Sequence, residues 1–230
     1  MISFVVPAYN EEKYLGPTLA AIHAAARAVG EPYEIVVAND DSSDGTVQLA
    51  ESGGARVVTV HKRQIAGTRN AGAKAAQGEW LVFVDADTHV NAEVVRGAVE
   101  ALRGGAVGGG AGVRFDGGPR WVHWTTPVIV TLFRWVKWAA GCFVFARRDA
   151  FEKIGGFDEQ FYASEEIHLS RALKRLGRFV IVDAFVTTSA RKANEHTPWA
   201  LIKLLTRIAV RGEKGLKSRE LTSFWYPDKR

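Results

Sequence analysis

Short apolar runs alternate with amphipathic stretches along the first hundred residues. The runs at 2–6, 33–38, 56–60 and 80–84 are rich in β-branched and aromatic residues, which favours buried strands. Between them, apolar residues recur every three or four positions, which is typical of helices with one buried face. Strands and helices alternating at this spacing predict βαβ units, with parallel strands joined by right-handed crossovers.

Periodicity and punctuating residues together predict where these elements begin and end. We expect Pro7 to stop the first strand, because proline cannot donate to a ladder, and Gly30 to end the first helix. Ser164 is expected to cap a later helix that Gly177 ends. The predicted helices lie at 15–29, 46–51, 68–76, 91–102, 149–154 and 165–176.

The pattern changes after residue 102. A glycine-dense stretch, 104–118, contains an expected strand of a different, smaller sheet. Residues 120–140 carry four tryptophans, yet charged residues interrupt any apolar run of about 18 residues, so an amphipathic segment is predicted and not a membrane span. Residues 179–188 predict a strand pair or one bent strand, and 198–210 a basic amphipathic helix. We therefore divide a single domain into halves at 1–102 and 103–230.

Composition narrows the class of protein only a little. The single cysteine, Cys142, lies in an apolar run and is expected to be a buried thiol in a reducing compartment. The first residues already read as a strand, without the basic and apolar regions of a signal peptide, which predicts a cytoplasmic location. A net charge of +5 fits an anionic partner such as a phosphate-bearing ligand, anionic lipid or nucleic acid, without choosing among them.

Polar loops follow four of the predicted strands, at Pro7, Asn39, His61 and Asp85. Ligands of open α/β sheets bind outside the carboxyl ends of the strands. We therefore expect these loops to share one cleft.

Two acids end the most apolar strand. If the backbone stays extended through Ala86, Asp85 and Asp87 project to the same side. Paired hard oxygen ligands suit Mg²⁺ or Mn²⁺ bridging a phosphate. The alternative is that the same acids begin a turn or cap the helix that starts near Asn91.

Cations and a further acid line the expected cleft. Asp40 is placed to accept a hydrogen bond from a base or ribose, although an Asx turn explains its loop equally well. Lys62, Arg63 and Arg69 follow the third strand, where they would offset phosphate charge or serve as ordinary surface cations.

A second pair of acids, Glu165 and Glu166, stands at a predicted helix start. The helix dipole favours acids there, but an adjacent loop rich in aromatic residues and acids would hold a sugar or polyol while one glutamate takes its proton. His168 and His196 are candidate third ligands for the cation, against the alternative of ordinary surface or core histidines.

Six short motifs occur along the chain, at 5–11, 39–46, 69–72, 85–87, 155–159 and 165–166. In this order they resemble the motifs of family 2 glycosyltransferases of the GT-A fold. The resemblance implies a Rossmann-like, mainly parallel twisted sheet flanked by helices, with a small acceptor-side sheet. It further implies a nucleotide-diphosphate sugar donor, a DxD motif with Mn²⁺ or Mg²⁺, and hexosyl transfer with inversion.

The family's site residues map onto this chain one by one. By position, the resemblance assigns the nucleoside pocket to Pro7, Tyr9 and Glu11, the base to Asp40, and the general base to Glu166, where the family usually has aspartate. The remaining carried-over assignments are Asp85 at the ribose and Asp87 at the metal and diphosphate. Arg63 and Arg69, by their place beyond the third strand, and Ala86, between the two aspartates, complete the expected nucleotide-sugar-binding residues.

Three departures from the family pattern bear on specificity. Asn39 and Asp41 replace the usual residues around Asp40, Glu166 replaces aspartate, and His168 follows it. The QxxRW motif and membrane helices of processive members do not occur. The resemblance thus predicts a soluble enzyme that adds one sugar to a sugar, polyol or lipid-linked acceptor, with peripheral membrane contact as an option and no nucleic acid partner.

Two other classes remain open on the sequence. A non-catalytic nucleotide-sugar-binding or membrane-adaptor protein would lay the basic segment 199–208 on anionic lipid. A nucleotidyltransferase would share a related sheet and metal-binding acids, but its glycine-rich basic phosphate loop is not found, since 7–11 is acidic.

Overall fold

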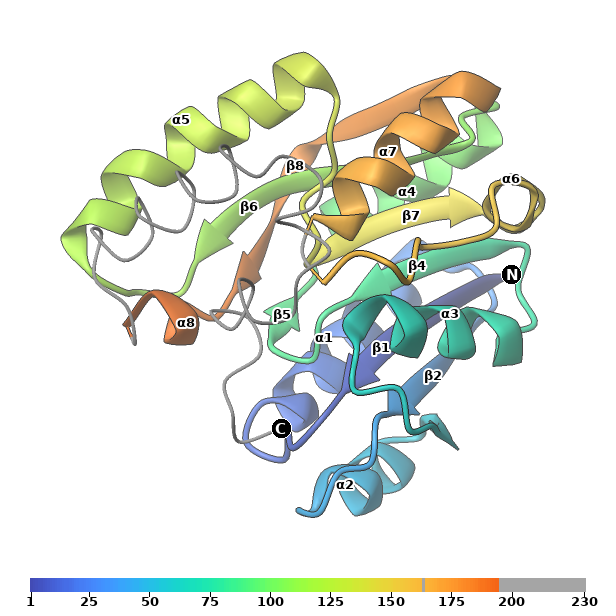
Figure 1. Cartoon of the computed structure of the whole chain (residues 1–230), viewed down its shortest axis with the longest axis vertical. Helices are drawn as coiled ribbons and strands as arrows, with labels where there is room; N and C mark the ends of the chain where they lie inside the picture. Colours follow the sequence, from blue (N-terminus) through green and yellow to red (C-terminus); the bar gives the residue numbers. More distant parts are fainter. Residues whose placement is uncertain (163, 195–230) are drawn as a thin grey trace.

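The computed structural model describes residues 1–162 and 164–194 as an α/β structure built on one eight-stranded sheet (Figure 1). The strand order is β3-β2-β1-β4-β7-β6-β8-β5. The strands are β1 (Ile2–Ala8), β2 (Tyr33–Asn39), β3 (Arg56–Thr59), β4 (Trp80–Val84), β5 (Thr88–His89), β6 (Gly108–Phe115), β7 (Phe143–Arg147) and β8 (Phe179–Thr188). The helices are α1 (Leu15–Val29), α2 (Thr46–Ser52), α3 (Ile65–Ala75), α4 (Ala92–Arg103), α5 (Arg120–Val136), α6 (Arg148–Lys153), α7 (Glu165–Leu176) and α8 (Arg191–Asn194).

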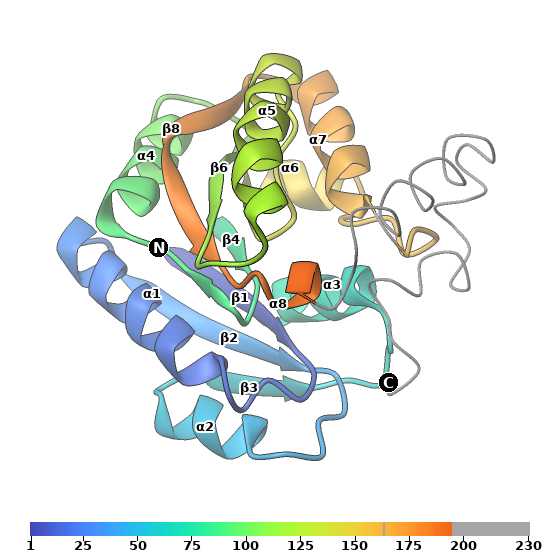
Figure 2. The ribbon, with the colours of Figure 1, turned by 90° about the vertical axis from the view of Figure 1, so that its left-hand side faces the viewer.

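Helices cover both faces of the sheet because most strands are apolar on both sides. Residues of α1, α2 and α4 pack with one face of β1 in the larger apolar cluster, and residues of α3, α6 and α7 pack with the other face in a second cluster. Figure 2 shows these groups on opposite sides of the strands. The α/β class and the mainly parallel central sheet are as predicted.

The expected smaller sheet is wrong for the described residues. β7 pairs antiparallel with both β4 and β6, and β6 pairs in parallel with β8, so these strands extend the main sheet. β8 is one strand, with a register shift opposite Ala111 and Gly112 that accommodates its bend. The sequence could not show this, because pairing partners of glycine-rich strands are set by distant residues.

Pro7 does not stop β1, contrary to expectation. β1 stays paired with β2 through Ala8, whereas its pairing with β4 ends at Val5. The carbonyl of Ala8 accepts from Asp40 on the β2 side, so the nitrogen of Pro7 points to the other side, beyond the last β4 pair. Its missing N–H therefore removes no ladder bond.

The glycines predicted to end helices do so, but the start of α3 and the cap of α7 differ from the prediction. Gly30 ends α1 in the left-handed conformation, and Gly177 follows α7, both as predicted. α3 begins at Ile65, three residues before the predicted start. Ser164 precedes α7 with φ of 63°, and its hydroxyl makes no capping hydrogen bond, since capping requires an extended backbone. None of the described helices combines the length and hydropathy needed to cross a membrane.

Gly72 sets how closely α3 approaches the sheet. A Cβ on this residue would lie 2.5 Å from Cγ1 of Val5 and 3.2 Å from Cβ of Ala38. We predict that Gly72→Ala lowers the free energy of unfolding by about 1–3 kcal/mol, because it overpacks the α3–sheet contact. Urea denaturation measures this change.

Gly16 is the matched control for that substitution. It also lies in a helix, α1, but a Cβ there would meet nothing within 4 Å. Gly16→Ala is expected to leave stability unchanged or raise it by up to about 1 kcal/mol. Equal losses in the two variants would contradict the packing account.

Candidate functional site

Asp85 and Asp87 share a cavity even though the backbone between them is not extended. β4 ends at Val84, and the amide of Thr88 donates to the carbonyl of Asp85 at 3.0 Å, which closes a turn. Both carboxylates still line one small cavity of about 50 Å³. The turn and the shared acidic site, posed as alternatives by the sequence, therefore occur together.

The cavity lies at the carboxyl ends of β1, β2 and β4, where open α/β sheets bind ligands. Most of the residues that the sequence placed at a nucleotide-sugar site line it. Those predicted are Pro7, Tyr9, Glu11, Asp40, Asp85, Ala86 and Asp87, and those not predicted are Ala8, Ile65, Thr68 and Arg191.

Arg69 is buried, with only 1% of its surface exposed, and does not face the cavity as a free phosphate-binding cation. Its guanidinium donates to Asp85 at 2.6 Å, to Glu165 at 2.7 Å and to the carbonyl of Gly141 at 2.8 Å. Although burial alone would lower the pKa of Arg69, Asp85 and Glu165 raise it above its usual value. Arg69 thus joins the β4 turn to the start of α7.

Glu166 stands beside this buried pair with its own carboxyl group held protonated near neutral pH. Burial, together with the charge of Glu165, raises the pKa of Glu166 to about 8. Its Oε2 lies 3.5 Å from where a Cβ on Gly141 would stand, and a nitrogen of Arg69 lies 3.7 Å from the same point. Glu166 and Arg69 therefore both lie next to Gly141, at distances of ordinary van der Waals contact from a Cβ there.

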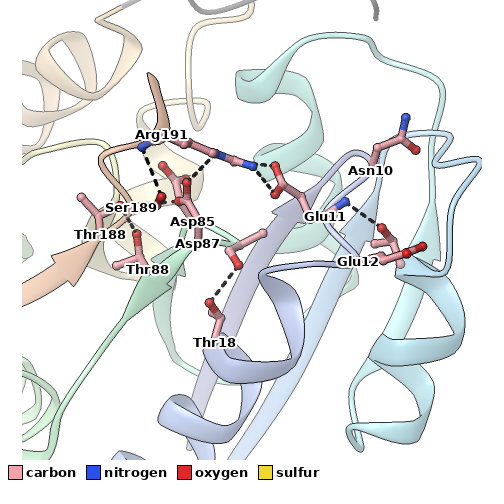
Figure 3. Close-up of polar contacts among 12 residues, drawn as sticks. Asn10, Glu11, Glu12, Thr18, Asp85, Asp87, Thr88, Thr188, Ser189 and Arg191 are labelled. Atoms are coloured by element: carbon pink, nitrogen blue, oxygen red, sulfur yellow. Dashed lines mark hydrogen bonds and ion pairs between the residues drawn. The ribbon is translucent and has the colours of Figure 1, made fainter. Parts of the chain in front are cut away.

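Arg191 supplies a second cation that sequence reasoning missed. It follows β8, and Figure 3 shows it reaching from there to Glu11 and Asp87. Two nitrogens bind Glu11 at 2.7 Å each, and Nε lies 2.9 Å from Asp87. Burial alone would lower the pKa of Arg191, but Glu11 and Asp87 raise it. Its position 180 residues from Glu11 left no local signal.

Asp40 organises a loop of its own chain. One oxygen accepts from the amides of Lys62 and Arg63 at 2.7 and 3.0 Å, and the other accepts from the hydroxyl of Thr68 at 3.0 Å. The carboxylate is almost fully buried, so it fixes the β3–α3 loop against the end of β2. The base contact that the resemblance implied stays a prediction.

The remaining candidates lie away from the two aspartates. Arg63 donates to the hydroxyl of Tyr9 at 3.0 Å and stacks over its ring. Lys62 pairs with Glu159 at the surface. The ring of His168 stacks on Phe161 at 3.8 Å and does not line the cavity. His196 lies outside the described residues.

The donor set at the turn fits a hard divalent cation in type. Mg²⁺ and Mn²⁺ bind through one or two carboxylates plus substrate phosphates and water, and Asp85 and Asp87 line the same cavity. Each carboxylate is paired with an arginine, and the described residues contain no cluster of three metal-ligating side chains. The described side chains alone therefore do not form a metal site, and metal binding at the two aspartates stays a prediction.

A mainly parallel sheet with acidic side chains gathered at its carboxyl edge defines an α/β protein with a polar ligand site at that edge. The sequence model of glycosyl transferase family 2 matches residues 3–155. The chain belongs to this family.

Curated relatives match less than half of the chain. An undecaprenyl-phosphate 4-deoxy-4-formamido-L-arabinose transferase of Edwardsiella ictaluri is 34% identical over 107 residues, covering 44% of this chain and 33% of that protein. A dolichol-phosphate mannosyltransferase of Pyrococcus furiosus is 32% identical over 110 residues, covering 46% of this chain and 31% of that protein. The chain thus spans about a third of these relatives' length.

Solved structures share the fold. Staphylococcus aureus TarS 1–349 in complex with UDP-GlcNAc has a TM-score of 0.62 at 21% identity, covering 82% of this chain and 58% of that one. Mannosyltransferase PcManGT of Pyrobaculum calidifontis, in complex with GDP-Man and Mn²⁺, also has a TM-score of 0.62 at 21% identity, covering 81% and 56%. Both are glycosyltransferase structures, which confirms the predicted fold.

The Arg69 cluster consists of Arg69, Asp85, Glu165 and the carbonyl of Gly141. We predict a large loss of stability when its only cation is removed. Arg69→Met would leave Asp85 and Glu165 without their shared partner, at a cost of about 3–5 kcal/mol in the free energy of unfolding. Chemical denaturation at pH 7 measures it.

Lys62→Ala provides the control, since it removes a cation from a pair whose side chains are both 44% exposed. Its expected cost is below about 1 kcal/mol. A similar small loss for Arg69→Met would show that the buried cluster does not hold the turn to α7.

Proposed function

We propose that this chain transfers one sugar from a nucleotide-diphosphate sugar to an acceptor hydroxyl, with inversion at the anomeric carbon and with Mn²⁺ or Mg²⁺. The observation that carries the proposal is the Arg69 cluster, which brings the acidic turn and the glutamate pair of α7 together. Family membership and the nucleotide sugars bound by the two solved relatives support the donor class.

The two halves of the chain divide the substrates in this proposal. Residues 1–102 supply the donor site, in which Pro7, Tyr9 and Glu11 hold the nucleoside and Asp40 fixes the loop at the base. Asp85 and Asp87 would hold the cation, which when bound would offset the charge of the diphosphate. The half from 103 onward supplies Glu166 and the acceptor surface.

Glu166 acts as the general base in the transfer step. The acceptor oxygen bonds to the anomeric carbon on the face opposite the diphosphate, and its proton passes to the carboxylate of Glu166. The bond from that carbon to the diphosphate breaks, and its electron pair leaves with the diphosphate. Arg191, held by Glu11 and Asp87, is positioned to receive the charge released there.

Local charge favours both the cation and the raised pKa of the base. Among the described residues, two arginines, Arg69 and Arg191, pair with carboxylates at this site. The carboxyl groups gathered there are those of Glu11, Asp85, Asp87, Glu165 and Glu166. Five carboxyl groups and two cations leave an excess of negative charge, which a divalent ion or a bound proton reduces.

Asp87→Asn is predicted to lower turnover in Mn²⁺ by about a hundredfold, because it removes a charge from the ligand for the cation. Release of nucleoside diphosphate from a panel of nucleotide sugars measures the rate. Asp149→Asn, at an exposed aspartate that pairs with Arg147 away from the cavity, serves as control and is expected to keep full activity. Undiminished turnover in Asp87→Asn would remove its assigned role.

The raised pKa of Glu166 predicts an acidic limb in the pH profile, along which the rate falls as the pH is lowered below about 8. A general base acts when deprotonated, so kcat/KM is expected to rise about tenfold per pH unit up to about 8 and then level off. Glu166→Gln should reduce the rate by about 10²–10⁴-fold and abolish this limb.

Glu93→Gln is the matched control, because Glu93 also stands in the first turn of a helix, α4, but is solvent-exposed and lines neither cavity. We expect Glu93→Gln to keep the wild-type rate and the wild-type pH profile. If the acidic limb persists in Glu166→Gln, proton transfer belongs to another group.

A further inference from the structure

A second, larger cavity of about 350 Å³ lies between α5 and the sheet. α5 contributes residues at helical spacing, and β6, β8 and the loop before β7 supply the remaining wall. Its side chains are mostly apolar: Ala111, Val113, Phe115, Trp121, Val122, Ile129, Val130, Phe133, Trp138, Ala140, Cys142 and Ile181. Such a lining offers few hydrogen-bond partners to a sugar or polyol.

The larger cavity borders the small one at the acidic turn. Asp85 and Asp87 line both cavities, and Thr188 and Ser189 line the larger one beside them. The other polar lining residues, Thr125, Thr126 and Arg134, belong to α5. The amide of Ser189 donates to the carbonyl of Asp87 at 3.1 Å, so the end of β8 is fixed against the acidic turn. One end of the apolar cavity therefore lies at the two aspartates.

α5 is apolar on its solvent side as well. Trp124, Val128, Leu132 and Trp135 recur along this outer face and are each at least half exposed. Among the described residues, most of the exposed large apolar side chains lie on this one helix. A helix that only covers a core is apolar on its inner face alone. Because α5 is apolar on both its inner and its outer face, its surface suits contact with an aliphatic ligand.

We propose that the cavity under α5 holds the aliphatic chain of a lipid-type acceptor, whose reacting hydroxyl lies at the Asp85–Asp87 end. This inference rests on the proposed glycosyl transfer, and it names one class of acceptor for that reaction. A cavity of about 150 Å³ holds one benzene, so this one takes a chain of roughly ten to twelve carbons. Burying each methylene there increases the affinity about fourfold.

Binding of alkyl glucosides of increasing chain length, below their micelle-forming concentrations, tests the assignment by calorimetry on the full chain. From methyl through octyl to decyl glucoside, affinity should rise about fourfold per methylene. Affinity that does not depend on chain length would overturn the proposal. So would concentration-dependent dimerisation, seen by light scattering, that the alkyl glucosides do not reverse, because a second copy would then be the occupant.

Two threonines of α5 give a matched pair of variants. Each donates its hydroxyl to the carbonyl four residues earlier at 2.7 Å, but Thr126 lines the cavity and Thr131 faces solvent. Thr126→Phe should weaken decyl glucoside binding at least tenfold by filling the cavity, and Thr131→Phe should not change it. Equal affinities in the two variants would overturn the assignment, and the wild-type series decides alone if Thr126→Phe does not fold.

A separate titration of wild type with UDP, GDP and Mn²⁺ distinguishes this inference from the proposed function. Chain-length-dependent binding without nucleotide binding would leave the cavity assigned and remove the glycosyl-transfer function. Nucleotide binding without chain-length dependence would leave the function standing and overturn the lipid-type acceptor.

Discussion

The buried guanidinium of Arg69 is the interaction on which the rest of the site depends. It holds the turn after β4, the loop before β7 and the first turn of α7 through charge-assisted hydrogen bonds to Asp85, Gly141 and Glu165. A buried cation costs several kcal/mol to desolvate, so it persists only because its carboxylate partners remain in place. The donor-side acids and the glutamates of α7 are therefore fixed relative to one another, although they are about 80 residues apart in sequence.

Charge within this cluster connects the fold to the proposed chemistry. Burial and the neighbouring Glu165 disfavour ionisation of Glu166, which raises its pKa into the range useful for a general base. On the other side of the turn, Arg191 holds Asp87 and Glu11 together. The same two aspartates border both a small polar cavity and a large apolar one, so the turn after β4 lies between the two cavities.

Much of the donor half could be predicted from sequence, because its signals are local. Apolar runs located β1, β2 and β4, and the acids after them lie in the cavity at the sheet edge. The roles of Arg69 and Arg191 could not be predicted, since a basic residue near a strand end has no local feature that distinguishes a surface cation from the centre of a buried cluster.

The prediction errors in both halves have the same origin. Pro7 remained in β1 because β4 had already diverged, and Ser164 failed to cap α7 because its backbone is left-handed. The separate small sheet was wrong because β7 joins β4 to β6. Each outcome depends on which distant segment lies alongside, which residue types and spacing do not encode.

The central claim, that the acidic turn binds a nucleotide diphosphate together with a divalent cation, is tested most directly by thermal unfolding of the wild-type protein. Ligands that bind only the folded state raise the midpoint temperature. The account predicts a small shift with Mn²⁺ alone or with a nucleoside diphosphate alone, and a larger shift than their sum when both are present. No metal-dependent shift with any nucleoside diphosphate or its sugar would contradict it.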